Sequence, residues 1–381
     1  MSALPEALAA ATEDQPAARV ALAAALSAPS HAYLFTGPAG CGKRAAARAF
    51  VAELLAEEAP DPESARRRLL AEPSPHPDLA WLSPPGAQHL VEEVRERVIE
   101  AAPYRPFEGE RRAFVIEEAD AMAEESQNAL LKTLEEPASY AHLILVSSQP
   151  SALLDTVRSR CQQINFAALG PDALAERLAA THAGLDPLEL RAAARLAGGD
   201  LERAELLLTQ RGRELRAGAE ELARATRSGK LDGAPWKGML DAAAERGAEV
   251  GELAKARLDT LADQAKDSSD RRSEQRLRKE AIELAKRAAR RGRTDALDAG
   301  LALTGAWLRD LAAIGDGAAA LVLAADRERE LADDAAGLDP RRARRGAELV
   351  MDTRRRLSVN VSEELALEAL AFRLGYLLRA T

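Results

Sequence analysis

FVIEEADAMAEESQNALLKTLEEPASYAHLILVSSQPSALLDTVRSRCQQINF, residues 114–166, begins with a short apolar run that ends in two carboxylates, Glu117 and Glu118. A buried parallel strand ends in this way when its carboxyl end faces a ligand. Apolar residues then recur at helical spacing until Pro137. The pattern predicts a strand followed by a helix.

A second apolar run in the same segment, residues 143–146, ends in Ser147 and Ser148. Polar side chains thus follow both runs at the point where each strand ends. Because the carboxyl ends of neighbouring parallel strands open on one crevice, both tips are expected to face the same ligand. The predicted fold class is therefore an α/β core, a parallel sheet with flanking helices.

A glycine-rich loop precedes this segment. Residues 31–36 have the pattern of a strand, residues 37–44 read GPAGCGKR, and an alanine-rich helix follows. This is the context of a P-loop, in which backbone N–H groups approach phosphates and a lysine supplies a cation. The predicted nucleotide contacts are Gly37, Gly40, Gly42, Lys43 and Arg44.

Arg44 stands where a serine or threonine hydroxyl normally holds magnesium in a P-loop. We interpret the loop as a degenerate P-loop, with a plain glycine-rich turn carrying an exposed lysine as the alternative. The sequence leaves open whether ATP or ADP binds without the hydroxyl.

The composition limits the classes of protein to consider. A chain of 381 residues indicates two or three domains, and 52 basic against 61 acidic residues give a net charge of −9. Because duplex DNA is bound through cations, an acidic chain favours protein partners. Two cysteines are too few for a disulfide framework, and no apolar run approaches membrane-spanning length. A cytoplasmic protein with no membrane partner is expected.

Two motifs carry a family resemblance. NALLKTLEEP at residues 128–137, followed by a strand and by RSRC at residues 158–161, resembles the clamp loaders of replicative DNA polymerases, a class of oligomeric P-loop ATPases. The EEAD strand end and the altered P-loop are most similar to the delta-prime subunits of bacterial DNA polymerase III. The resemblance covers the first 210 residues or so and returns at residues 360–374, NVSEELALEALAFRL.

This resemblance implies roles for the strand tips. Glu117 stands where the family has an acidic metal contact, and Glu118 where it has the general base for the attacking water. Ser148 lies where a polar side chain reads the γ-phosphate, although a serine pair capping a strand end is the alternative. Glu118 is expected to be a vestigial base, because a carboxylate accelerates nothing unless magnesium and the γ-phosphate are held in place.

Arg160 is implied to be an arginine finger that acts in trans. In clamp loaders this arginine projects into the ATP site of the adjacent subunit and stabilises the charge of phosphoryl transfer. A surface salt bridge is the alternative. The neighbouring Arg158 has no such assignment and is expected to be structural.

Zinc is expected to be absent. Many bacterial relatives carry a four-cysteine zinc module between the P-loop and the first acidic strand. In this chain residues 56–85 are rich in proline and contain no cysteine, and His76 cannot bind zinc alone. No metal ligand is therefore predicted.

The resemblance and the helical spacing together predict three domains: a P-loop core at 1–167, a small helical lid at 168–212 and a helical collar at 213–381, which joins five subunits in a ring in this family. In the lid, Glu202 stands where motor subunits place an arginine on the γ-phosphate. Arg203 follows one residue later and would face elsewhere, because a helix turns by about 100° per residue. Glycine segments, including Gly292-Arg293, are expected to interrupt the collar helices.

The predicted function is that of a delta-prime-like clamp-loader subunit. It would join the other subunits in a five-membered ring, load the sliding clamp onto primed DNA, and contact DNA mainly through the complex. It would donate Arg160 and hydrolyse little or no ATP. The alternatives are an active ATPase motor subunit of the same fold and an unrelated P-loop enzyme, such as a small-molecule kinase.

Overall fold

The computed structural model describes the chain except residues 1–3, 73, 85–87, 265–270, 358–361 and 380–381, and the side chains of 257–281. It divides into two compact units, Met1–Leu169 and Gly170–Thr381. The division into core, lid and collar stays a prediction, and its boundary at residue 212 falls inside helix α11 (Gln210–Ser228).

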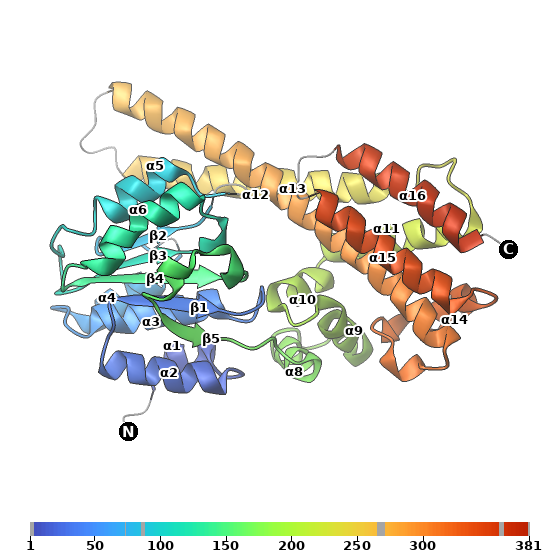
Figure 1. Cartoon of the computed structure of the whole chain (residues 1–381), viewed down its shortest axis with the longest axis horizontal. Helices are drawn as coiled ribbons and strands as arrows, with labels where there is room; N and C mark the ends of the chain where they lie inside the picture. Colours follow the sequence, from blue (N-terminus) through green and yellow to red (C-terminus); the bar gives the residue numbers. More distant parts are fainter. Residues whose placement is uncertain (1–3, 73, 85–87, 265–270, 358–361, 380–381) are drawn as a thin grey trace. The chain divides into compact units, whose positions relative to one another are not determined.

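The N-terminal unit is built on a parallel five-stranded sheet in the order β2-β3-β4-β1-β5 (Figure 1). The strands are β1 (Ala32–Thr36), β2 (Leu79–Leu82), β3 (Arg112–Ile116), β4 (Ala141–Ser147) and β5 (Gln162–Asn165). Ile116 of β3 lies opposite Leu145 of β4, so the two polar strand tips are neighbours, as predicted. The α/β fold class is confirmed.

Helices cover both faces of this sheet (Figure 1). Successive side chains of a strand point to opposite faces, and Tyr33 and Phe35 of β1 accordingly pack in one core cluster and Leu34 in the other. The first cluster includes α1 (Glu6–Ala11), α2 (Pro16–Ser27), α3 (Lys43–Ala56) and α4 (Pro62–Leu70). The second includes α5 (Val91–Val94), the π-helix Arg95–Ile99, α6 (Glu124–Glu135) and α7 (Asp155–Arg158).

The proline-rich interval contains two elements for which the sequence carried no prediction. Helix α4 begins at Pro62, and the Asp61 side chain caps it by accepting from the Ser64 N–H at 3.1 Å. Strand β2 has only four residues and lies at the edge of the sheet, where it pairs with β3. So short a strand is defined by its neighbour more than by its own pattern.

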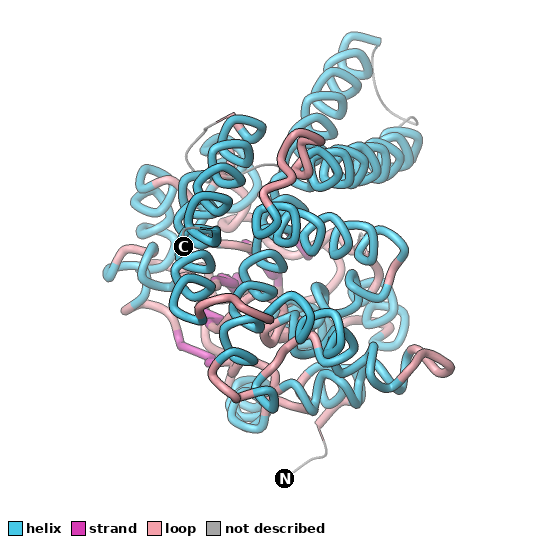
Figure 2. The backbone as a smooth tube through the Cα atoms, turned by 90° about the vertical axis from the view of Figure 1, so that its right-hand side faces the viewer, coloured by secondary structure: helices cyan, strands magenta, loops and turns pink. Residues whose placement is uncertain are grey.

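The described part of the C-terminal unit contains helices and turns and no strand, and the strands in Figure 2 belong to the other unit. Its helices are α8 (Pro171–Thr181), α9 (Pro187–Ala197), α10 (Leu201–Leu208), α11, α12 (Lys237–Gln264), α13 (Arg271–Gly315), α14 (Glu328–Ala335), α15 (Pro340–Leu357) and α16 (Glu363–Arg379). None of the helices in the described ranges has the length and apolar character needed to span a bilayer.

The predicted helix break at Gly292 is wrong, because α13 continues through it. A Cβ atom on Gly292 would lie 2.8 Å from a methyl carbon of Val250 in α12, so this glycine permits close packing of two helices. Gly229, Gly317 and Gly337 do lie just beyond helix ends, with φ angles of 73°, 75° and 73°. These left-handed values favour glycine and confirm the other predicted breaks.

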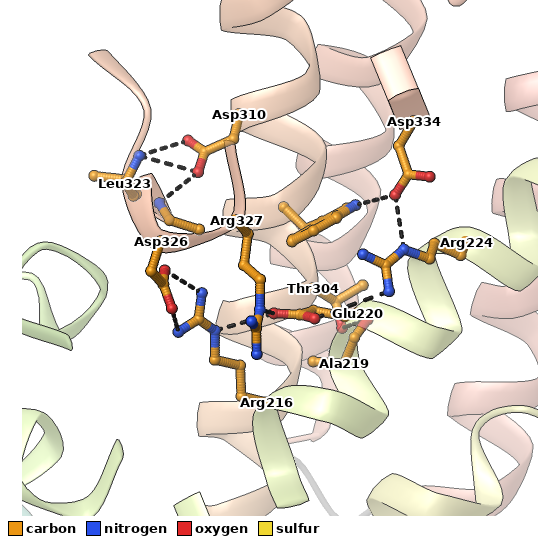
Figure 3. A network of polar contacts seen from close by, with 12 residues as sticks. Arg216, Ala219, Glu220, Arg224, Thr304, Asp310, Leu323, Asp326, Arg327 and Asp334 are labelled. Atoms are coloured by element: carbon orange, nitrogen blue, oxygen red, sulfur yellow. Dashed lines mark hydrogen bonds and ion pairs between the residues drawn. The ribbon is translucent and has the colours of Figure 1, made fainter. Parts of the chain in front are cut away.

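Buried ion pairs and hydrogen bonds join the helices of the C-terminal unit (Figure 3). Arg216 of α11 makes a bidentate contact with Asp326 at 2.8 and 2.7 Å. Asp310 of α13 is fully buried, and its carboxylate accepts from the backbone N–H groups of Leu323 at 3.0 Å and Ala324 at 2.9 Å. These contacts hold the segment after α13 against α11 and α13.

Candidate functional site

The glycine loop between β1 and α3 has the backbone of a phosphate-binding turn. Gly37, Gly40 and Gly42 have φ angles of 150°, 66° and 93°, which disfavour residues with a side chain. A Cβ atom on Gly37 would lie 2.3 Å from the carbonyl oxygen of Phe166. The predicted glycines are therefore required by the local backbone.

Lys43 begins α3 and points into the loop. Lys43 is only 5% exposed, and its Nζ donates to the Gly37 carbonyl at 2.7 Å and to the Pro38 carbonyl. Nζ also lies 3.2 Å from the hydroxyl of Ser148 at the tip of β4. The alternative of a turn with an exposed lysine is therefore excluded by the burial of Lys43.

Arg44 pairs with the carboxylate at the tip of β3. Its Nε lies 3.1 Å from Oε1 of Glu117, and its terminal nitrogen contacts Glu72. The other oxygen of Glu117 accepts from Trp81 Nε1 at 3.1 Å and from Ser83 Oγ at 2.6 Å. Both oxygens of the predicted metal contact are thus engaged by side chains of the same unit.

A second guanidinium lies one turn further along α3. Arg48 stacks on the indole ring of Trp81, with 4.3 Å between Cζ and the ring centroid. Burial lowers the pKa of the Arg48 guanidinium from its ordinary value; Glu72 opposes this shift, and nearby Arg44 adds to it. Lys43, Arg44 and Arg48 therefore supply three cations near the two carboxylates of Glu72 and Glu117.

The two serines at the tip of β4 make different contacts. Ser147 is buried, and its hydroxyl accepts from the Gln149 N–H at 3.1 Å, which is a capping contact. Ser148 presents its hydroxyl to Lys43, and its backbone N–H donates to Asp120 at 3.0 Å. Ser148 therefore lies beside the P-loop, where a γ-phosphate reader is expected.

Glu118 has an unusual backbone. Its φ and ψ angles of 49° and 52° lie in the left-handed region, which is uncommon for a residue with a side chain and costs on the order of 1 kcal/mol. It precedes the short 3₁₀ turn Ala119–Ala121. Such strain is typical of a functional strand tip.

Arg160 lies apart from these groups, between α7 and β5. Its guanidinium contacts Glu135 of α6 at 2.5 Å and donates to the Thr156 carbonyl at 2.9 Å. Its side chain is 35% exposed. The nearby Arg158 pairs with Asp155 at 3.1 Å, as a structural arginine would.

Residues 15–170 match the family model described as DNA polymerase III, delta subunit. This part of the chain is similar to the proteins that the family model describes. The matched range contains the P-loop, both strand tips and Arg160.

The chain is similar to subunits of bacterial DNA polymerase III. The subunit delta' of Pseudomonas aeruginosa is 38% identical over 197 residues, 49% of this chain and 58% of the relative. The subunit delta' of Bacillus subtilis is 36% identical over 151 residues, 39% of this chain and 46% of the relative. Tau and gamma/tau subunits also match. The chain spans about half the length of the delta' relatives.

A solved DNA polymerase III, gamma subunit-related protein of Thermotoga maritima aligns with 94% of this chain and 99% of its own, at 14% identity and a TM-score of 0.45.

Three side chains around the P-loop and the tip of β3 carry no local sequence signal. Gln15 directly precedes α2, and its side-chain amide bonds to the Cys41 carbonyl at 3.1 Å and to the backbone of Ala167, which joins the P-loop to the chain after β5. Glu72 and Trp81 hold Arg44 and Glu117 from the proline-rich interval. Only the tertiary structure shows that Gln15, Glu72 and Trp81 contact the P-loop and the strand tip.

The sequence also predicts a helical lid and the absence of zinc from the proline-rich interval. His76 is buried, its Nδ1 accepts from the Asp78 N–H at 3.2 Å, and burial lowers the pKa of its imidazole. No group of three or more His, Cys, Asp or Glu side chains in the described ranges could hold a metal; the absence of zinc stays a prediction. In the lid, Arg203 lies 3.5 Å from Asp298 of α13, within its own unit.

Proposed function

We propose that this chain is a delta-prime-like subunit of a bacterial DNA polymerase III clamp loader. In this role it joins the other clamp-loader subunits in a five-membered ring in the cytoplasm and helps to load the sliding clamp onto primed DNA. The chain itself hydrolyses little or no ATP and donates Arg160 to the ATP site of a neighbour.

The ion pair between Arg44 and Glu117 carries this proposal. Phosphoryl transfer in P-loop proteins depends on magnesium held by a loop hydroxyl and a strand carboxylate. Here the hydroxyl is replaced by a guanidinium, which lies 3.1 Å from the carboxylate. A subunit so altered keeps its place in a ring but lacks the means to position the metal for hydrolysis.

The C-terminal unit and the charge of the chain agree with this role. Arg203, displaced by one residue from the γ-phosphate position of motor subunits, is engaged by Asp298. The net charge of −9 favours protein partners, so that DNA is contacted mainly through the complex. An active ATPase motor subunit is the second candidate, since the chain is also similar to tau and gamma/tau subunits.

Reconstitution tests the proposal. The purified chain is expected to assemble with the delta and tau or gamma subunits of the same genome, to show negligible ATP turnover alone, and to be required for clamp loading by the complex. ATP turnover by the isolated chain at the rate of the motor subunit would favour the second candidate. Failure to assemble with any of these subunits would refute both.

A further inference from the structure

A guanidinium stands in this loop where a P-loop normally has the hydroxyl that holds magnesium. Arg44 is held between two carboxylates, with Nε 3.1 Å from Glu117 and a terminal nitrogen on Glu72. Glu117 is only 15% exposed, and its second oxygen is engaged by Trp81 and Ser83. The cation at this strand tip is therefore part of the chain.

Magnesium does not fit beside this ion pair. The metal requires near-octahedral oxygen ligands at about 2.0–2.1 Å. The loop supplies no hydroxyl at position 44, and Glu117 would have to release Arg44 to reach a metal. A divalent ion held by Glu117 would also stand close to the Arg44 guanidinium, whose Nε is 3.1 Å from the same carboxylate, and like charges repel strongly in a partly buried site.

Phosphate oxygens fit the same residues better. An arginine fork engages two oxygens at once, and the N-terminus of the fourteen-residue helix α3 favours an anion. Lys43 is bonded to the carbonyls of Gly37 and Pro38. Phosphate oxygens would compete with these neutral carbonyls for the Lys43 ammonium, because an anionic oxygen adds Coulombic attraction to the hydrogen bond.

We propose that this P-loop binds the diphosphate group of a nucleotide without magnesium, with Arg44 taking the part of the metal between Glu117 and the phosphates. That the ligand is a nucleotide rests on the proposed function. That it binds without magnesium is inferred from the Arg44–Glu117 pair. A nucleotide held in this way is a structural ligand of the subunit.

Isothermal titration of the full chain with ADP tests the proposal, once in excess MgCl₂ and once in excess EDTA. Wild type is expected to bind at least as tightly in EDTA, because magnesium withdraws free ADP from a site that does not use the metal. Arg44→Ser restores a hydroxyl and releases Glu117. This variant is expected to bind ADP more tightly in MgCl₂, by about tenfold or more, as is typical when a contact that supports a metal is gained or lost.

Arg67→Ser is a matched control, since it removes an exposed charge from α4. It is expected to behave as wild type. Thermal melts establish that both variants are folded. As a second readout, proton relaxation by Mn²⁺ in the presence of ADP is expected to report a protein-bound ion for Arg44→Ser and none for wild type.

Three results would overturn the proposal: tighter ADP binding by wild type in MgCl₂ than in EDTA, no binding of ADP in either buffer, or binding by Arg44→Ser that magnesium does not strengthen. Each is measured on the isolated chain. Assembly and clamp loading by the reconstituted complex are measured separately, so failure of this proposal can be told from failure of the proposed function.

Discussion

Arg160→Ala should have a small effect on stability. The Arg160–Glu135 pair joins side chains that are 35% and 49% exposed, and ion pairs of such exposure contribute about 0.2–1 kcal/mol. The change should therefore lower the free energy of unfolding by about 1 kcal/mol or less. For a domain of this size that corresponds to a fall in melting temperature of about 2–4 °C at most.

The expected effect on the assembled complex is much larger. An arginine finger supplied in trans contributes on the order of 10³ or more in rate at its site, about 4 kcal/mol, although several sites in one ring dilute the loss. Arg160 must leave Glu135 to reach a neighbour, and this costs about 1 kcal/mol at most. Glu135→Gln should therefore change the activity of the complex by no more than about fivefold. Arg160→Lys should restore little of the activity that Arg160→Ala loses, because lysine lacks the planar fork.

The assay combines two measurements on each variant. DNA-stimulated ATP hydrolysis and clamp loading are measured in the reconstituted complex, and thermal unfolding is measured on the isolated chain. Arg158→Ala is the matched control, because Arg158 is 36% exposed and pairs with Asp155 within the same short helix. It should shift the melting temperature as little as Arg160→Ala and leave the activity of the complex intact.

Two results would refute the reasoning. A strongly destabilised Arg160→Ala chain within a fully active complex would show that the arginine is a structural partner of Glu135. Equal losses of activity in Arg158→Ala and Arg160→Ala would show that the short helix as a whole is needed and that no single guanidinium reaches the neighbour.

Asp310→Ala should destabilise the C-terminal unit by about 3 kcal/mol or more in urea unfolding, because three hydrogen bonds from the backbone N–H groups of Leu323 and Ala324 lose their acceptor; an effect below about 1 kcal/mol would contradict this. Gly37→Ala should prevent a native P-loop, seen as a lower melting temperature, since its Cβ atom would meet a backbone oxygen at 2.3 Å. Burial lowers the pKa of His142 in the folded chain, so the unfolded chain binds the proton more readily and stability should fall as the pH drops below about 6.5. His142→Gln should remove part of that fall in thermal melts, and an unchanged pH profile would exclude this histidine as a cause. Elemental analysis should find no zinc, and one tightly bound equivalent would show that the ligands were misread.

The α/β core and its P-loop could be predicted because their signals are local. A buried strand is a short apolar run, a phosphate loop needs glycines at set positions, and the tips at Glu117 and Ser148 follow directly from the runs before them. The order of strands then brings Lys43 to Ser148 and Arg44 to Glu117. The family resemblance is a local signal too, because two short motifs carry it.

The partners of these residues could not be predicted, because they come from distant parts of the chain. Glu72 and Trp81 reach the site only because the short strand β2 pairs at the edge of the sheet beside β3. The chain contains 61 acidic residues, and nothing local distinguishes Glu135 as the partner of Arg160. Side-chain pairing is set by which elements become neighbours.

Gly292 illustrates the same limit in the helical unit. In sequence, a glycine that ends a helix looks the same as one that allows two helices to approach closely. The first needs a left-handed backbone, as at Gly229, and the second needs only the absence of a Cβ atom facing Val250. Local sequence determined that α-helices would dominate this unit, whereas the packing of α12 against α13 decided whether this glycine breaks a helix or joins two.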